Sequence, residues 1–390
     1  MDRRKLIATA AATFAATLSE HARAYKGSVE DFIVSPDFQK RHATRFVELD
    51  TEALMDFLGG YMRMQQEYGG VNAHPERVAF LKARGYPLGP VDLSWQECHD
   101  IMMQAPHYAA YVRTSRTVHE QMWAWAMDSI LKHEDLYLSA MEATDKSGPG
   151  SLEMNMGMTI PEYCLHEIHE QPGGYCGNPF AGMLYHYATV TSFYQGLAPG
   201  TVVHDERNAL MVARYPTPPD GKLKRILELG CSDGRSTIAL KERFPDAEVW
   251  GIDIGAPQVR YAHHRAAHMG IDVHFAQRLG EDSKFPDNYF DMITVNAVFH
   301  EVAAFATKNV VPEMARITRP GGIWIGDGSG TGGDYKFPGT IIAKAAIWVN
   351  HRYNNEVWEV QNHSHIWPEL RKASGWGTDL STGKPIAVKV

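Results

Sequence analysis

Short apolar runs alternate with helical patterns between residues 224 and 327, and this alternation constrains the fold more than any other feature of the chain. Repeated strand–helix–strand units with short connections predict parallel strands joined by right-handed crossovers. The runs are continuously apolar, which predicts a doubly wound α/β sheet covered on both faces. The expected strands are Arg225–Leu229, Glu248–Asp253, Val273–Ala276, Asp291–Asn296 and Gly322–Gly326, with helices at about 236–244, 257–269 and 302–318.

A glycine-containing turn from Gly230 to Gly234 follows the first of these strands. Glycine lets the backbone come close to a ligand, and Ser236 or Thr237 can begin a helix with free N–H groups. Asp253 closes the second strand, where a carboxylate can accept both hydroxyls of a ribose. The spacing departs from G-x-G-x-x-G, so we expect a nucleoside site without a phosphate cradle.

The same stretch resembles the class I S-adenosylmethionine-dependent methyltransferases. That family carries E/D-x-G-x-G-x-G after its first strand, matched here by Glu228, Gly230 and Gly234, with Ser232 at the middle glycine. FPDNYFD at 285–291 and RPGG at 319–322 are also typical of the family, and the resemblance covers roughly residues 222–330. It implies a Rossmann-like, seven-stranded methyltransferase sheet that ends in a helix at 368–373 and an antiparallel strand at 384–390.

The resemblance also implies the cofactor, S-adenosyl-L-methionine, and its product, S-adenosyl-L-homocysteine. The glycine motif would line the methionine moiety, Asp253 would hold the ribose and Ile254 would lie against the adenine. The family's usual Asp or Asn after the third strand is Leu279 here, so a neighbouring N–H or Glu281 would meet the adenine's polar edge. The predicted cofactor-binding residues are Glu228, Gly230, Ser232, Gly234, Asp253, Ile254, Gly280, Glu281 and Asn296, the last beside the sulfonium.

His300 and Glu301 follow the fourth strand, at the edge where ligands bind in open α/β sheets. A hydroxyl, amine or thiol that accepts a methyl group must lose a proton, whereas a thioether needs no base. We therefore predict His300 and Glu301 as catalytic residues, with His300 the first choice for a base or substrate ligand. The alternative is that His300 caps the next helix or packs under the cofactor.

Residues 163–194 are dense in Tyr, His, Gly and Phe, and we expect them to form a lid over the substrate. The alternative is that they merely join two domains. An inserted helix within 337–353 is expected to help form the substrate pocket. The predicted substrate residues are His169, Tyr175, Tyr185, His186, Trp348 and Arg352.

No metal site is predicted, although the chain has 19 histidines and 4 cysteines. His166 and His169 do not have the H-E-x-x-H spacing, and the cysteines show no paired C-x-x-C. We expect His263, His264 and His268, which lie on the second crossover helix, at the surface.

The remaining sequence predicts how the chain is organised. Residues 28–144 carry apolar residues at helical spacing, so we expect a helical domain and lid over 1–200 that supports a homodimer. The methyltransferase domain would span 201–390, with an insertion at 331–365. The net charge of −8 argues against a nucleic-acid partner, and no run approaches the ~20 apolar residues of a membrane span. Residues 1–24 resemble an export signal, but charged residues crowd its end, and we favour an Ala-rich helix in a cytoplasmic protein.

These observations predict a methyltransferase that acts on a small-molecule oxygen or sulfur acceptor, including a thioether acid. Asn296-Ala-Val-Phe stands where many amino methyltransferases carry Asp-Pro-Pro-Tyr, which argues against base amines as acceptors. Two alternatives stay open. One is an enzyme of this fold that uses S-adenosylmethionine without methyl transfer, such as a pericyclase, and the other is a non-catalytic S-adenosylmethionine-binding interaction protein.

Overall fold

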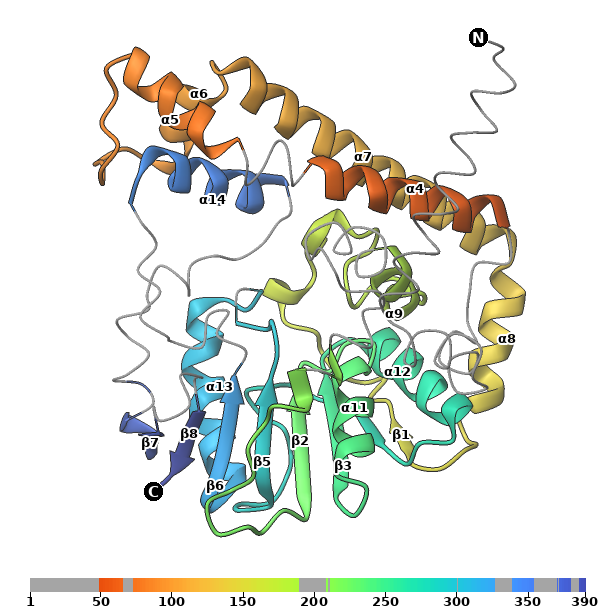
Figure 1. Ribbon diagram of the computed structural model, residues 1–390. Coiled ribbons are helices and arrows are strands. Elements are labelled where there is room, and N and C mark those ends of the chain that lie inside the picture. The colour runs from red at the N-terminus through yellow and green to blue at the C-terminus, as the bar shows by residue number, and fades with distance from the viewer. Residues whose placement is uncertain are drawn as a thin grey trace, which may run out of the picture. The chain divides into compact units, whose positions relative to one another are not determined.

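An eight-stranded sheet in the order β1-β4-β3-β2-β5-β6-β8-β7 organises the computed structural model (Figure 1). The strands from β1 to β6 in this order are parallel, whereas β8 is antiparallel to both β6 and β7. The strands are β1 (Ser151–Glu153), β2 (Arg225–Leu229), β3 (Glu248–Asp253), β4 (His274–Gln277), β5 (Phe290–Val295), β6 (Thr318–Gly326), β7 (Trp376–Asp379) and β8 (Ile386–Lys389). The structure describes residues 49–65, 73–188, 208–209, 211–299, 301–326, 339–353, 370, 372–379 and 386–390, all within the unit Phe46–Val390.

The predicted fold class is confirmed, with one more strand than expected. β2 and β3 have the predicted bounds, and the closing strand β8 runs antiparallel as the resemblance implied. The unexpected strand is β1, which pairs with β4 at one edge of the sheet, Ser151 opposite His274. Its three residues form no apolar run, and the segment is a strand because it pairs with β4.

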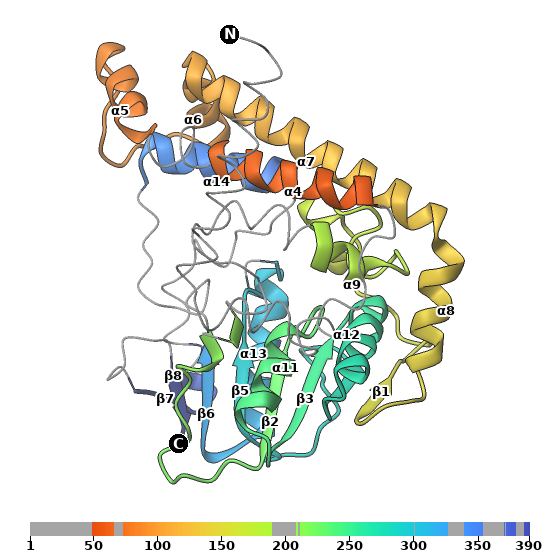
Figure 2. The same ribbon diagram turned by 45° about the vertical axis from the view of Figure 1, so that its right-hand side comes forward.

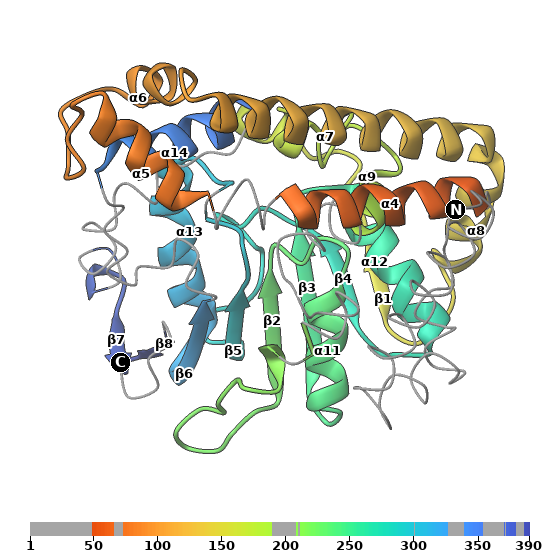
Figure 3. The ribbon, with the colours of Figure 1, turned by 45° about the horizontal axis from the view of Figure 1, so that its top comes forward.

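Helices cover both faces of the sheet, α11 (Arg235–Arg243) and α12 (Ala256–Met269) on one and α13 (Ala304–Ile317) on the other (Figures 1 and 3). Side chains alternate along β2, so Ile226 packs with α11 and α12 while Leu227 packs with α13. The helix α12 has a proline in its first turn and stops at Gly270 in the left-handed conformation. Because these crossovers make β2, β3, β4 and β5 parallel, the carboxyl ends of the four strands lie at the same edge of the sheet.

The described residues between 49 and 144 are mostly helical, as predicted. They contain α4 (Leu49–Gln65), α5 (His74–Ala83), α6 (Trp95–Met102), α7 (Pro106–Lys132) and α8 (Glu134–Thr144). The long helix α7 contributes to two separate cores: Met122 packs with α4 and α8, and Tyr108 packs with α6 (Figure 2). The helix α14 (Ile341–Tyr353) joins the second core, where Ile341 packs with residues of α6.

The prediction of three surface histidines on α12 is wrong for two of them. His268 is exposed, but His263 and His264 are buried. Both imidazoles contact Thr144 at the end of α8, His263 Nε2 at 2.9 Å from its carbonyl and His264 Nδ1 at 2.9 Å from its hydroxyl. The outer side of α12 is thus covered by α8, which the sequence pattern of α12 alone does not show.

Several predictions fall on residues that the structure does not describe. These are His300, the signal-like segment 1–24 and the proposed domain boundary near residue 200. Among the described residues no helix is long and apolar enough to cross a membrane, and no three His, Cys, Asp or Glu side chains gather as they would around a metal ion.

Candidate functional site

A cavity of about 930 Å³, counted with its open mouth, lies where β2, β3 and β5 end. One wall comes from the sheet and its loops: Leu229, Gly230, Ser232, Ile252, Asp253, Ile254, Arg278, Gly280, Glu281, Asn296, Ala297, Val298, Glu301, Val302 and Val310. The other wall comes from residues 162–188, here called the cap: Tyr163, Cys164, Ile168, Tyr175, Cys176 and Tyr185.

The turn after β2 has no room for side chains at its glycines. Gly230 has φ +72°, and a Cβ there would overlap the side chain of Val298. Gly234 has φ +79°, and a Cβ there would lie 2.8 Å from the Cβ of Ala262. Ser232, between them, holds φ +47° although it is not glycine, and this sparsely populated conformation is typical of functional sites.

Asp253 is fixed by backbone N–H groups at the end of β3. Its Oδ2 accepts from the N–H of Ser232 at 3.0 Å and its Oδ1 from the N–H of Gly255 at 2.9 Å. Each carboxylate oxygen has a further lone pair, so two hydroxyls of a ligand can still bind. Burial raises the pKa of Asp253 to about 6, against the hydrogen bonds from Gly255 and Ser232 that lower it.

Glu228 lies behind the glycine turn rather than in the cavity wall. It is buried, and Thr237 Oγ1 donates a hydrogen bond to its Oε2. Burial raises the pKa of Glu228 to about 8, against hydrogen bonds from Thr237 and Ser236. Asn296 Nδ2 donates to Ser236 Oγ at 3.3 Å, so the end of β5 is connected through α11 to the turn after β2.

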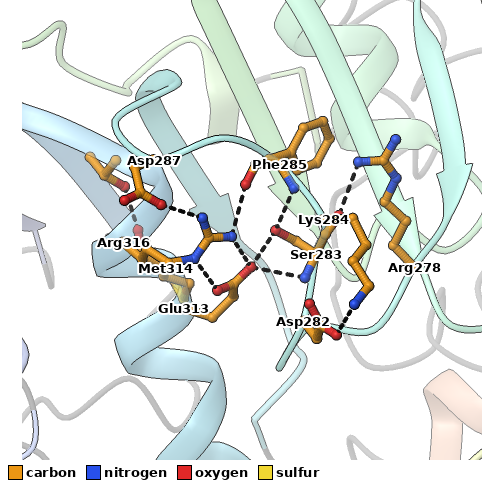
Figure 4. A network of polar contacts seen from close by, with 10 residues as sticks. Arg278, Asp282, Ser283, Lys284, Phe285, Asp287, Glu313, Met314 and Arg316 are labelled. Carbon is orange, nitrogen blue, oxygen red and sulfur yellow. Dashed lines mark hydrogen bonds and ion pairs between the residues drawn. The ribbon is translucent and has the colours of Figure 1, made fainter.

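The loop after β4, which carries Gly280 and Glu281, is anchored to α13 (Figure 4). Glu313 on that helix accepts hydrogen bonds from Ser283, at 2.9 Å from its backbone N–H and 2.5 Å from its hydroxyl. Arg316 donates to the carbonyl of Phe285 at 2.8 Å. On the cavity side, Tyr163 of the cap donates its hydroxyl to Glu281, so cap and loop are joined directly.

The cap brings two thiols to the cavity, Cys164 and Cys176. Burial is the main cause that raises the pKa of each to about 12. Both are therefore protonated at neutral pH and are poor nucleophiles. Tyr175 and Tyr185 meet edge to face with ring centroids 5.5 Å apart, which gives the cap wall an aromatic surface.

Glu301 belongs to the sheet wall of the cavity, and its carboxylate contacts two residues of the cap. His169 Nε2 lies 3.1 Å from its Oε1, and the hydroxyl of Tyr175 donates to the same oxygen at 3.4 Å. The side chain of Glu301 is 16% exposed, whereas that of His169 is 2% exposed. His169 therefore does not line the cavity but lies behind Glu301, which does.

The structure brings most of the predicted residues together, with clear exceptions. Glu228 and Gly234 shape the turn without lining the cavity, and His186 lies apart from it, with its Nδ1 2.8 Å from the hydroxyl of Tyr261. Trp348 on α14 packs near His99 of α6, and neither Trp348 nor Arg352 lines this cavity.

The sequence pointed to only some of the cavity residues. Arg278, Ala297 and Val298 line the cavity but were not predicted, and Cys176 lies in the predicted lid but was not singled out. Ala297 has φ +54°, a second non-glycine residue in the left-handed region at this wall. Its place directly after the predicted Asn296 is the one sequence feature that could have indicated it.

The fold and the site define a class. Residues 226–322 match the family described as "Methyltransferase domain". This segment is a class I S-adenosylmethionine-dependent methyltransferase domain, and S-adenosylmethionine is its cofactor.

Individual relatives match over this part of the chain. The chain is 35% identical over 99 residues to the demethylmenaquinone methyltransferase of Thermus thermophilus, a match that covers 25% of this chain and 44% of the relative. It is 31% identical over 127 residues to the ubiquinone/menaquinone biosynthesis C-methyltransferase UbiE of Burkholderia mallei, covering 31% and 48%. The chain therefore spans less than half the length of these curated relatives.

A solved structure of Haemonchus contortus phosphoethanolamine N-methyltransferase 2, in complex with phosphomonomethylethanolamine and S-adenosylhomocysteine, gives a TM-score of 0.36. It is 18% identical and the match covers 51% of this chain and 44% of that one. Because this similarity is only partial, it gives no information about the methyl acceptor of this protein.

The residues present fit a cationic nucleoside cofactor. Gly230 lines the cavity without a side chain, so a ligand can approach its backbone. Among the described residues that line the cavity are three carboxylates, those of Asp253, Glu281 and Glu301, and one guanidinium, that of Arg278. Arg278 is itself paired with Glu153 at 2.7 Å, so the wall favours a positively charged ligand.

Proposed function

We propose that this protein transfers a methyl group from S-adenosylmethionine to an oxygen or sulfur atom of a small molecule. One observation carries the proposal: Asp253, on the cofactor side, and Glu301, beneath the cap, line the same cavity. The cofactor supplies an electrophilic methyl group when bound. The chain must then bind the acceptor, exclude water and take up a proton.

Glu301 is the residue we propose as the base. Its carboxylate lies at the cavity wall, with His169 Nε2 3.1 Å behind it, and the Tyr175 hydroxyl donates to the same oxygen from the cap wall. An acceptor O–H or S–H bond breaks, its electron pair stays on the acceptor, and the proton goes to Glu301. Tyr175 and Tyr185 give the cap an aromatic wall that excludes water and holds the acceptor in one orientation.

A second candidate is methylation at carbon, and the relatives favour it. Both matched relatives are named as methyltransferases of quinone biosynthesis, one of them as a C-methyltransferase. A phenol that loses its proton is nucleophilic at its ring carbon as well as at its oxygen. The same base would therefore serve both reactions, and the methylated product distinguishes them.

The test compares Glu301→Gln with Glu162→Gln, an exposed glutamate of the cap. Formation of S-adenosylhomocysteine is measured with a panel of phenols, enols, thiols and thioethers, and S-adenosylmethionine binding by calorimetry. We expect Glu301→Gln to lower kcat by about 100-fold or more while the cofactor Kd stays within about threefold. Glu162→Gln should match the wild type.

Two outcomes would contradict the proposal. If the wild type consumes no S-adenosylmethionine with any acceptor but still binds it, the protein belongs with the enzymes or binding proteins that do not transfer methyl. If Glu301→Gln is fully active, no base acts at this position, and an acceptor without an ionisable proton, such as a thioether, is favoured.

A further inference from the structure

We propose that His169 is a positioning residue for Glu301, held in place by helix α7 through a strained turn of the cap. The inference rests on the proposed function of Glu301 and extends it to residues far from the cofactor. In this role His169 donates a hydrogen bond from Nε2 to Glu301 and so keeps the carboxylate ionised and oriented for the acceptor.

Two consecutive residues of the cap, His169 and Glu170, have φ of +56° and +54°. The left-handed region is unfavourable for a residue other than glycine, and such residues persist only where surrounding contacts hold them. A pair of them at one turn therefore needs contacts that hold the turn.

Helix α7 supplies these contacts from a single face. Trp123 donates its indole N–H to the carbonyl of His169 at 2.9 Å, a fully buried hydrogen bond. His119 lies one turn earlier, with its Nδ1 3.7 Å from Oε2 of Glu170. Burial lowers the pKa of His119 to about 3, so its imidazole is neutral at physiological pH. Residues four apart on a helix share a face, so one side of α7 lies against both strained residues, and Trp123 holds the first of them by a hydrogen bond.

The turn places the imidazole of His169 against Glu301, at 3.1 Å between Nε2 and Oε1. Among the described residues, the groups near Glu301 include the hydroxyl of Tyr175, which donates to it at 3.4 Å, and the hydroxyl of Tyr185 and the carboxylate of Asp253, which interact with its charge. The charge of Asp253 opposes ionisation of Glu301. A hydrogen-bond donor behind Glu301 counteracts this repulsion, because it stabilises the charged form.

The first experiment compares His169→Phe with His169→Gln. Glutamine retains an N–H donor of similar reach but cannot be protonated, whereas phenylalanine retains only bulk. For His169→Phe we expect kcat to fall about 10- to 100-fold, and the acidic limb of the kcat pH profile to move up by about one pH unit. His169→Gln should recover most of the loss and the wild-type limb, and the cofactor Kd should stay within about threefold in both.

The second comparison tests the tether from α7. Trp123→Phe removes the indole N–H but keeps an aromatic ring, and Trp125→Phe is its matched control, because Trp125 is a 45% exposed tryptophan of the same helix. We expect Trp123→Phe to reproduce the shift of His169→Phe to a smaller extent and Trp125→Phe to have no effect. If the acidic limb of the kcat pH profile is unchanged in both His169→Phe and Trp123→Phe, the inference is wrong. It is also wrong if His169→Gln is as impaired as His169→Phe.

A measurement without turnover separates this inference from the proposed function. In protein labelled with ¹⁵N-histidine, the ring signals of His169, assigned through His169→Gln, are compared at a single pH in the wild type and in Glu301→Gln. We expect Glu301→Gln to move the Nε2 signal of His169, because the carboxylate that accepts its hydrogen bond is replaced by a neutral amide. Identical ring signals in both proteins would overturn the inference even if methyl transfer is observed. If the wild type forms no S-adenosylhomocysteine, the proposed function fails and these ring signals alone decide the pairing.

Discussion

The two walls of the cavity are built by different means. The sheet wall consists of strand ends and the turns that follow them, so Gly230, Asp253 and Asn296 are placed by strand register and helix crossovers. The cap wall has only short helical turns, and its conformation depends on side chains from elsewhere, such as Trp123, which lies 46 residues from His169. Local pattern therefore specifies the cofactor side, whereas the acceptor side depends on distant contacts.

The largest effect is expected from a substitution that adds a single methyl group to the sheet wall. Gly230→Ala places a Cβ against Val298 at a positive φ, so we expect the cofactor affinity to fall by about 100-fold or more because the turn must move. Gly221→Ala is the matched control, because Gly221 has φ +71° and a Cβ added there would meet nothing within 4 Å. It should lose about 1 kcal/mol of stability and bind normally. Equal binding by the two variants, measured by calorimetry, would show that backbone space at Gly230 does not matter.

Buried carboxylates behind the same wall predict a dependence of stability on pH. The pKa of Glu228 is raised from 4.5 to about 8, so between these values the folded protein holds a proton that the unfolded chain has lost. Stability is then fully present below pH 4.5 and declines as pH rises toward 8, by about 1.4 kcal/mol per pH unit for this group.

Urea unfolding of Glu228→Gln across this range should remove that component of the slope. Glu313→Gln is the opposite case, because hydrogen bonds from Arg316 and Ser283 outweigh burial and lower the pKa of Glu313. It should differ from the wild type by a constant amount over the same range. A wild type and a Glu228→Gln variant with parallel pH curves would mean that Glu228 is ionised in the folded protein.

Cofactor binding should also depend on pH through Asp253. Because the pKa of Asp253 is about 6 in the free protein, its carboxyl group is protonated below that pH. The ribose hydroxyls and the cationic cofactor can then bind only after this proton is released. We expect the Kd to be flat above about pH 6 and to rise by up to tenfold per pH unit below it. Calorimetry near pH 6 in buffers of different ionisation enthalpy should detect proton release, and a Kd that is constant from pH 5 to 7 would contradict this assignment.

The smallest effect is expected where the two walls meet. Tyr163→Phe removes the hydroxyl that the cap donates to Glu281, and the loop after β4 keeps its anchors on α13. We expect the cofactor Kd to rise about two- to fivefold, as for the loss of one hydrogen bond. Tyr289→Phe removes a similar bond to Glu248, at 3.0 Å and at the opposite end of β3, and should leave the Kd unchanged.

The sequence predicted the sheet side well because its strands and turns are specified by local pattern. β2 and β3 were found to the residue because each is a buried run that ends in a turn. β1 was missed because the three residues Ser151–Glu153 have no strand pattern of their own, and pair only because β4 offers an edge.

Long-range packing is the part of the structure that the sequence pattern does not specify. Trp348 does not line the cavity, and its helix packs on α6, more than 200 residues earlier in the chain, so its place at the substrate stays a prediction. Tyr163 and Glu281 lie 118 residues apart, and their bond has no sequence signal. His263 and His264 were placed on the surface because the covering helix, α8, belongs to a different part of the chain.

The edge strand β1 has a consequence for how the protein is made. Its side-chain bond from Ser151 to His274 spans 123 residues. At ribosomal rates of about 5–20 residues per second, β1 leaves the ribosome roughly ten seconds before its partner β4 exists. The opposite edge closes later still, when β8 joins β6 after α14 has been synthesised. The nascent chain must therefore carry an incomplete sheet with two open edges, and we expect its yield in cells to depend on chaperones more than that of a sheet built from consecutive strands.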